Sequence, residues 1–295
     1  MEKHGRATFI RYRTGEVRLV WRILMAVLIY VAVAFFLRFI PIFLSTVIQS
    51  SRGIDKQEAL EASKAIVFEH PIWSTTIGII NALMSFLLVW FLMKVIEKRR
   101  FTLKGVGLEW RRNSLLCLVF GALLALLIYV AGVVVNRVLG FSIPTMDSFL
   151  VGVTVSAVIR NFALYIPMGF SEEVLFRGYV QSRLVERHGA VRGILIGSIV
   201  FTLLHMLAGS MSPVTIISGV ILWAAVGTLY HCSRSLYIVG MFHGVANILL
   251  NTLPVEGGDA AGVIVHTIAL LLIIVVGLRR SKSSRIPSHP PGSVH

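Results

Sequence analysis

The chain has 295 residues, of which 56% are hydrophobic and only 14% are charged. A soluble domain has about 25% charged residues, and here the apolar excess falls in long blocks, which excludes a soluble globular domain and a disordered chain. The net charge of +14 would favour nucleic acid binding in a soluble protein, but basic residues also gather at the cytoplasmic ends of membrane spans. We therefore predict an all-α, polytopic membrane protein with no nucleic acid partner.

Eight apolar blocks are long enough, or nearly so, to cross a hydrocarbon core of about 30 Å as helices. We expect these transmembrane helices at residues 23–45, 73–93, 114–139, 149–171, 193–208, 213–230, 236–253 and 261–278. The prediction divides the chain into a basic N-terminal segment (1–22), an eight-helix domain (23–278) with a catalytic core over about 149–253, and a basic, disordered tail (279–295).

The distribution of lysine and arginine orients these spans. With the N-terminus in the cytoplasm, 22 of the 28 basic residues fall in cytoplasmic segments, and only Arg52, Lys56 and Lys64 fall on the opposite side. This asymmetry follows the positive-inside rule. We therefore expect a multi-pass protein of the cell membrane with both basic termini in the cytoplasm.

Three smaller features accompany the spans. Asp55, ahead of an amphipathic pattern, predicts a short capped helix within residues 49–72 that lies on the outer membrane interface. Cys117 and Cys232 form no CxxC pair, so both are expected to be free thiols. His266 has no acidic or histidine neighbour in its span, which favours a hydrogen-bonded packing residue.

An adjacent pair of glutamates is the first polar feature that needs an explanation, because an ionisable group in hydrocarbon costs at least about 2.5–3.5 kcal/mol. Glu173 and Arg177 are four residues apart, share one helical face and are expected to form an ion pair. Glu172 points about 100° away from that face, so it must find its partner on another helix or take up a proton.

The other two polar features are His205, in the fifth predicted span, and His243 with Asn247 one turn later, in the seventh. A helical hairpin that turns at Gly189 would place Glu172 opposite His205, because both are equally distant from the turn. His243 lies at a similar depth below the same membrane surface. We therefore predict that these four polar residues meet in the cytoplasmic half of the bilayer.

A carboxylate, two imidazoles and a carboxamide around a cavity suit the activation of water for hydrolysis. The carboxylate can act as the general base while one imidazole steers the water, and the second imidazole with the carboxamide can stabilise an oxyanion. Two alternatives stay open. The two histidines and one glutamate could bind zinc, although we predict no cofactor. A non-enzymatic transporter, immunity or interaction protein would use the same cluster to bind a proton, an ion or a peptide.

At these residues the sequence resembles the CPBP family of intramembrane proteases, which includes the type II CAAX prenyl endopeptidases and the bacteriocin-processing and abortive-infection proteins. The family motifs EExxxR, FxxxH and HxxxN read here as residues 172–177, 201–205 and 243–247, once each and in this order. The resemblance covers about residues 172–250, and the remaining spans match only as a general eight-helix plan.

The resemblance implies a CAAX-protease-like helical bundle and a glutamate-dependent endopeptidase that opens to the cytoplasm. By position, the implied roles are water activation by Glu172 and His205, oxyanion binding by His243 and Asn247, and bracing of the fold by Glu173 and Arg177. The implied partners are the lipid bilayer and a membrane-anchored protein or peptide, which in the CAAX branch is prenylated and loses three C-terminal residues. No feature of the sequence selects that branch.

Overall fold

The computed structural model describes residue 10 and residues 17–68, 70–141, 154–208, 211–253 and 259–283, and every regular element within these ranges is a helix. Each predicted span corresponds to one helix of at least 16 residues. These are α1 (Leu19–Ser51), α3 (Pro71–Phe91), α5 (Ser114–Val138), α7 (Val155–Glu173), α9 (Ala190–His205), α10 (Pro213–Ser233), α11 (Leu236–Thr252) and α12 (Asp259–Ser283). The all-α prediction is therefore confirmed.

Not all of the predicted spans are confirmed as complete ones. Five described helices are long and apolar enough to cross a membrane: Leu19–Ser51, Pro71–Ile96, Ser114–Val138, Pro213–Ser233 and Ala260–Gly277. α9 and α11 are apolar but have only 16 and 17 residues, and α7 ends in the two glutamates. The chain is a multi-pass membrane protein, but eight full spans are not confirmed, because the helices that carry the polar residues are the short or interrupted ones.

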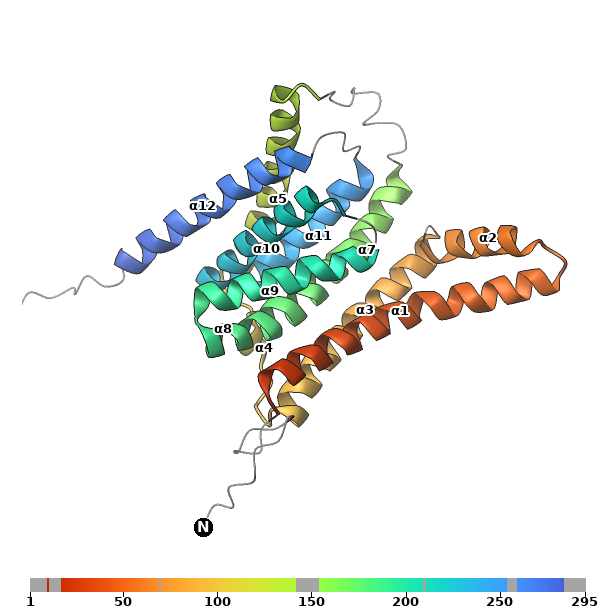
Figure 1. Ribbon diagram of the computed structural model, residues 1–295, viewed down its shortest axis with the longest axis horizontal. Coiled ribbons are helices and arrows are strands. Elements are labelled where there is room, and N and C mark those ends of the chain that lie inside the picture. Colours follow the sequence, from red (N-terminus) through yellow and green to blue (C-terminus); the bar gives the residue numbers. More distant parts are fainter. Residues whose placement is uncertain are drawn as a thin grey trace, which may run out of the picture.

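The helices form a central group with a cover on each side (Figure 1). α11 packs between α7 and α5, while α10 packs between α9 and α12, so α7, α9, α10 and α11 form the centre. α3 packs against α7 and α1 packs against α3 on one side, whereas α5 and α12 cover the other. The polar motifs of the sequence all lie on the central helices.

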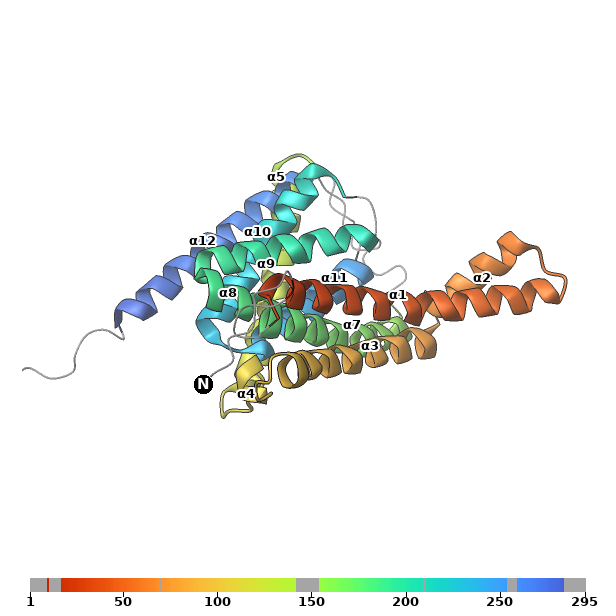
Figure 2. The ribbon, with the colours of Figure 1, turned by 60° about the horizontal axis from the view of Figure 1, so that its bottom comes forward.

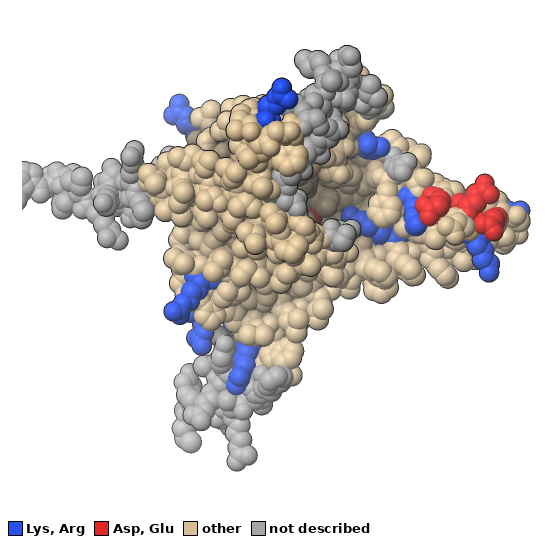
Figure 3. Space-filling model, turned by 45° about the horizontal axis from the view of Figure 1, so that its top comes forward, with Lys and Arg blue, Asp and Glu red and all other residues tan. Residues whose placement is uncertain are grey.

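The α1–α2 hairpin projects away from this bundle (Figure 2). The predicted short amphipathic helix is α2 (Lys56–Phe68), and Asp55 caps it by accepting the N–H groups of Gln57 at 2.8 Å and Glu58 at 3.4 Å. Its buried side chains face α1, where the Ser63 hydroxyl donates to Ser45. Most of the acidic surface visible in Figure 3 lies at this end of the molecule.

The helix that carries the two glutamates continues beyond the predicted span. α7 runs without a break into a π-helical segment, η2 (Val174–Gln181), and then into α8 (Ser182–His188). The predicted hairpin turn at Gly189 is confirmed, with a φ of +80° that favours glycine. Gly193 then allows close packing, because a Cβ there would lie 2.5 Å from the Val185 nitrogen.

Short elements complete the described chain. They are η1 (Leu92–Ile96), α4 (Leu103–Val106) and η3 (Met206–Ala208).

Three further predictions can be compared with the structure. Cys117 and Cys232 are free, and His266 is a hydrogen-bonded packing residue, 2.9 Å from the Ser218 hydroxyl. Residues 279–283, which the prediction assigned to the disordered tail, are the last residues of α12, and residues 284–295 lie outside the described residues.

Candidate active site

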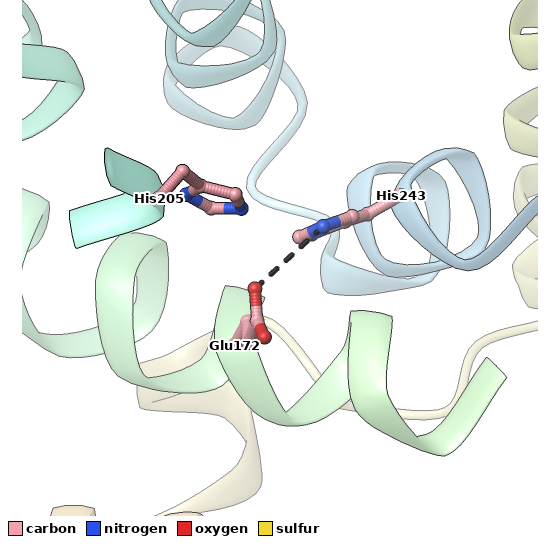
Figure 4. Close-up of side chains that lie close together, drawn as sticks. All are labelled: Glu172, His205 and His243. Carbon is pink, nitrogen blue, oxygen red and sulfur yellow. Dashed lines mark ion pairs between the residues drawn. The ribbon is translucent and has the colours of Figure 1, made fainter. Parts of the chain in front are cut away.

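Three predicted site residues converge from three central helices. Glu172 comes from α7, His205 from the end of α9 and His243 from α11, and one side-chain nitrogen or oxygen of each lies within 4.8 Å of the others. Figure 4 shows both imidazoles directed toward the carboxylate, with His243 Nε2 3.6 Å from Glu172 Oε2. Glu172 and His243 are buried and His205 is half-buried, so the cluster lies inside the bundle.

Glu172 has a hydrogen-bond partner on another helix, which is one of the two outcomes that the sequence left open. The hydroxyl of Tyr30, on α1, donates a 2.9 Å hydrogen bond to Glu172 Oε1. The other oxygen, Oε2, is buried and has no hydrogen-bond partner among the described residues. Because Tyr30 holds one oxygen, the second is left to bind a water or another ligand between the imidazoles.

Sequence reasoning missed Tyr30. A single tyrosine in an apolar span is usually a packing residue, and nothing in the spacing of the first span pointed to the glutamates. The one available signal was its hydroxyl, because a buried tyrosine O–H usually finds an acceptor.

Glu173 contacts both His243 of the cluster and the buried guanidinium of Arg177. Its Oε2 is 3.1 Å from Arg177 Nε, which is the predicted i,i+4 ion pair. Its Oε1 accepts a 2.9 Å hydrogen bond from His243 Nδ1, a contact that the sequence did not predict. A carboxylate only accepts, so this bond places a proton on Nδ1 of His243.

An aromatic wall surrounds Arg177 and also contacts both histidines. The guanidinium carbon lies 4.6 Å from the ring centre of Phe201 and 5.0 Å from that of Trp223. The ring centres of Phe201 and His205 are 4.6 Å apart, in an edge-to-face arrangement, and those of Trp223 and His243 are 4.8 Å apart. The phenylalanine of the FxxxH motif therefore positions a cation and an imidazole together.

The tautomer of His205 follows from its own hydrogen bond. Its Nδ1 lies 2.9 Å from the Phe201 carbonyl oxygen, four residues earlier on α9. A carbonyl only accepts, so Nδ1 carries the proton and Nε2 of the neutral ring has a lone pair. His205 can therefore accept a hydrogen bond from a water or bind a metal, but its neutral form cannot donate from Nε2.

Asn247 stands one helical turn after His243 on α11 and is half-buried. Within the described residues its carboxamide forms no hydrogen bond, whereas its backbone carbonyl accepts one from Asn251. The side chain thus keeps its two N–H donors unengaged by the described protein groups.

Close approach of α7 and α11 brings the glutamates to His243. A Cβ on Gly169 would lie 2.5 Å from the Gly244 nitrogen, and one on Gly240 would lie 2.8 Å from the ring of Phe170. Small residues at such a crossing allow two membrane helices to pack backbone to backbone. Sequence reasoning missed this contact, although the two glycines of α11 flank His243 at spacings of three residues before and one after.

A second buried carboxylate, that of Glu97, binds the continuation of α7 beyond the Glu–His cluster, in η2 and α8. Glu97, which follows η1, accepts hydrogen bonds from Arg22 at 2.8 Å, from Arg183 at 2.8 and 3.0 Å and from the Tyr179 hydroxyl at 3.0 Å. Burial, together with this carboxylate, raises the pKa of Tyr179, so its hydroxyl remains a donor. The network ties α1 and η1 to η2 and α8, and sequence reasoning missed it.

Comparison with known proteins agrees with this geometry. Residues 148–249 match the family model described as type II CAAX prenyl endopeptidase Rce1-like. No curated protein matches the chain. The matched segment contains all three motifs and every residue of the Glu–His cluster, so the resemblance found from the motifs is confirmed for this part of the chain.

Proposed function

We propose, from the match of residues 148–249 to type II CAAX prenyl endopeptidases, that this chain is an intramembrane endopeptidase with Glu172 as its general base. The observation that carries the proposal is the unpartnered, buried Oε2 of Glu172, which faces the imidazoles of His205 and His243. A buried acceptor between two ring nitrogens is suited to hold the water that attacks a peptide bond.

In the proposed reaction, Glu172 removes one proton from this water while Nε2 of His205 accepts a hydrogen bond from the other O–H. The water oxygen attacks the carbonyl carbon and forms a tetrahedral intermediate. Glu172 then returns the proton to the amide nitrogen, and the C–N bond breaks to release the amine. Tyr30 keeps the carboxylate oriented through its 2.9 Å hydrogen bond.

His243 and Asn247 are the proposed oxyanion donors. Since Nδ1 of His243 donates to Glu173, the imidazole can donate to an oxyanion only if Nε2 also carries a proton. With Nε2 protonated the buried charges balance, because the carboxylates of Glu172 and Glu173 face Arg177 and the imidazolium of His243. The carboxamide N–H of Asn247 is the second donor.

The proposed setting is an eight-span bundle with both termini in the cytoplasm. The 22-to-3 distribution of basic residues supports this orientation. The substrates are membrane-anchored proteins or peptides whose scissile bond enters from the cytoplasmic side. Prenylated proteins that lose three C-terminal residues are the substrate class of the CAAX branch, and they are the first candidates to test.

Zinc-dependent hydrolysis is the second candidate, because the three ligand atoms lie within 4.8 Å of one another. Both histidines donate Nδ1–H to an oxygen, Glu173 for His243 and the Phe201 carbonyl for His205, as metal-binding histidines usually do. Glu172, His205 and His243 would hold the ion, which would supply a water activated at neutral pH. In this case Nε2 of His243 would carry no proton.

The decisive experiment compares wild type with Glu172→Gln in nanodiscs, against a panel of membrane-anchored peptides with and without a lipid. We expect the variant to lose cleavage completely and to keep the thermal unfolding midpoint of the wild type. The matched control is Glu61→Gln, an exposed carboxylate on α2, which should cleave normally. Cleavage by Glu172→Gln would refute the mechanism, and a wild type that binds but never cleaves would favour the non-enzymatic alternative.

A further inference from the structure

A separate cavity of about 790 Å³ lies at the end of the bundle where predicted cytoplasmic segments meet. It is lined by residues between 104 and 120, by the end of α10, by the start of α11 and by residues 272–277 of α12. None of the residues of the Glu–His cluster lines it. Its volume falls in the range of about 300–1,000 Å³ that small-molecule sites occupy.

One end of this cavity is basic. Lys104, Arg111 and Arg234 line it, and Glu109 is the one acidic residue among the lining groups. Glu109 forms an ion pair with Arg111, in which Oε2 lies 2.6 Å from Nη2. Among the described residues, Lys104 and Arg234 have no acidic partner, so two positive charges remain available to an anion.

The other end is an apolar slot between α5 and α12. Leu116 and Phe120 of α5 line it from one side, and Leu272 and Val276 of α12 from the other. All four side chains are also exposed on the surface of the bundle, so the slot opens sideways into the region that lipid chains occupy. A charged group and a hydrocarbon chain could therefore enter together.

The basic end has a fixed framework. The N–H of Leu236 donates to the Gly107 carbonyl at 2.9 Å, and the Tyr237 hydroxyl donates to the Leu108 carbonyl at 2.9 Å. Trp110 packs edge-on against Tyr237 at 5.4 Å. These contacts join the α4 segment to the α10–α11 turn and hold the cavity open as a formed site.

We propose that this cavity binds an anionic phospholipid, with the phosphate between Lys104 and Arg234 and an acyl chain between α5 and α12. Basic pockets between transmembrane helices on the cytoplasmic side are suited to anionic lipid headgroups. A zwitterionic lipid offers the same chain but no net charge to the two cations. The proposal does not depend on the peptidase activity.

The two cysteines of the sequence provide the test, because Cys117 and Cys232 both line the cavity. The full chain is placed in nanodiscs of phosphatidylcholine, with or without phosphatidylglycerol, and its rate of labelling by N-ethylmaleimide is measured. We expect phosphatidylglycerol to slow labelling several-fold. The double variant Lys104→Gln/Arg234→Gln should label at the phosphatidylcholine rate in both membranes.

The matched control is Lys94→Gln/Arg192→Gln, which removes two exposed basic residues outside the cavity and should keep the protection. Leu116→Trp, which narrows the slot without changing the charge, should also reduce protection. Equal wild-type rates in the two membranes would overturn the proposal, as would protection that survives in Lys104→Gln/Arg234→Gln. Protection by a farnesylated peptide but not by phosphatidylglycerol would instead assign the cavity to a lipidated substrate.

Discussion

Nδ1 of His243 lies 2.9 Å from Oε1 of Glu173, and both side chains are fully buried. The second glutamate of the pair therefore holds the imidazole that faces the first, at the same time as it pairs with Arg177. Bracing of the fold and orientation of the site depend on one carboxylate. Changes at Glu173 should consequently affect both stability and activity, whereas changes at Glu172 should affect activity alone.

Replacing Glu173 with glutamine should destabilise the protein by about 3–5 kcal/mol, because Arg177 is left as a buried, unpaired charge. The measurement is the unfolding midpoint in nanodiscs, together with the cleavage rate. Lys64→Ala is the control, since it removes an ion pair with Glu61 that is exposed on both sides and should cost less than about 1 kcal/mol. Equal losses in the two variants would show that the buried pair has no special role.

Replacing Tyr30 with phenylalanine should slow cleavage roughly ten- to hundredfold while leaving the fold intact. The change removes only the hydroxyl that donates to Glu172, and a hydrogen bond to a charged group contributes about 1.5–3 kcal/mol. The effect should appear in kcat rather than KM, because in the proposed mechanism Tyr30 orients the general base Glu172. Tyr237→Phe loses a bond of equal length, to the Leu108 carbonyl outside the cluster, and should cleave at the wild-type rate.

Replacing Gly169 with alanine should separate α7 from α11 and lower both stability and cleavage. The added Cβ would lie 2.5 Å from the Gly244 nitrogen, and overpacking of this kind costs about 1–3 kcal/mol. Gly132→Ala on α5 is the matched control, because no atom beyond its own stretch of helix lies within 4 Å of its added Cβ. That variant should be as stable as the wild type or slightly more so. If both variants behave alike, close helix contact does not position the glutamates.

The hairpin at Gly189 and the ion pair of Glu173 with Arg177 could be predicted because both depend on distances along the chain. Equal spacing from a turn places residues side by side, and a spacing of four residues places them on one helical face. The π-helical η2 could not be predicted in this way, since the reasoning assumed a regular α-helix. The ion pair forms nevertheless, because Glu173 ends the regular helix and Arg177 lies within the first turn of the wider one.

The contacts of α1 and of the segment after η1 with the helix that carries the glutamates were the part that the sequence did not reveal. Tyr30 and Glu172 are 142 residues apart, and Glu97 and Arg183 are 86 residues apart. A single sequence offers no pattern that pairs such residues. Eight full spans are not confirmed for a related reason. An apolar block in the sequence does not show how many of its residues form one continuous helix, as the 16 residues of α9 illustrate.

Treatment with a chelator should distinguish the glutamate mechanism from zinc-dependent hydrolysis. In the proposed mechanism, cleavage is unchanged after dialysis against a chelator, and the purified protein contains less than one metal ion per chain. Added zinc should then inhibit, because Glu172, His205 and His243 converge within 4.8 Å and the ion would occupy the place of the attacking water. A zinc enzyme would give the opposite result, because its cleavage activity would be lost on chelation and restored by added zinc. His205→Gln supplies the control, since removal of one of the three ligands should weaken zinc inhibition in whatever cleavage remains.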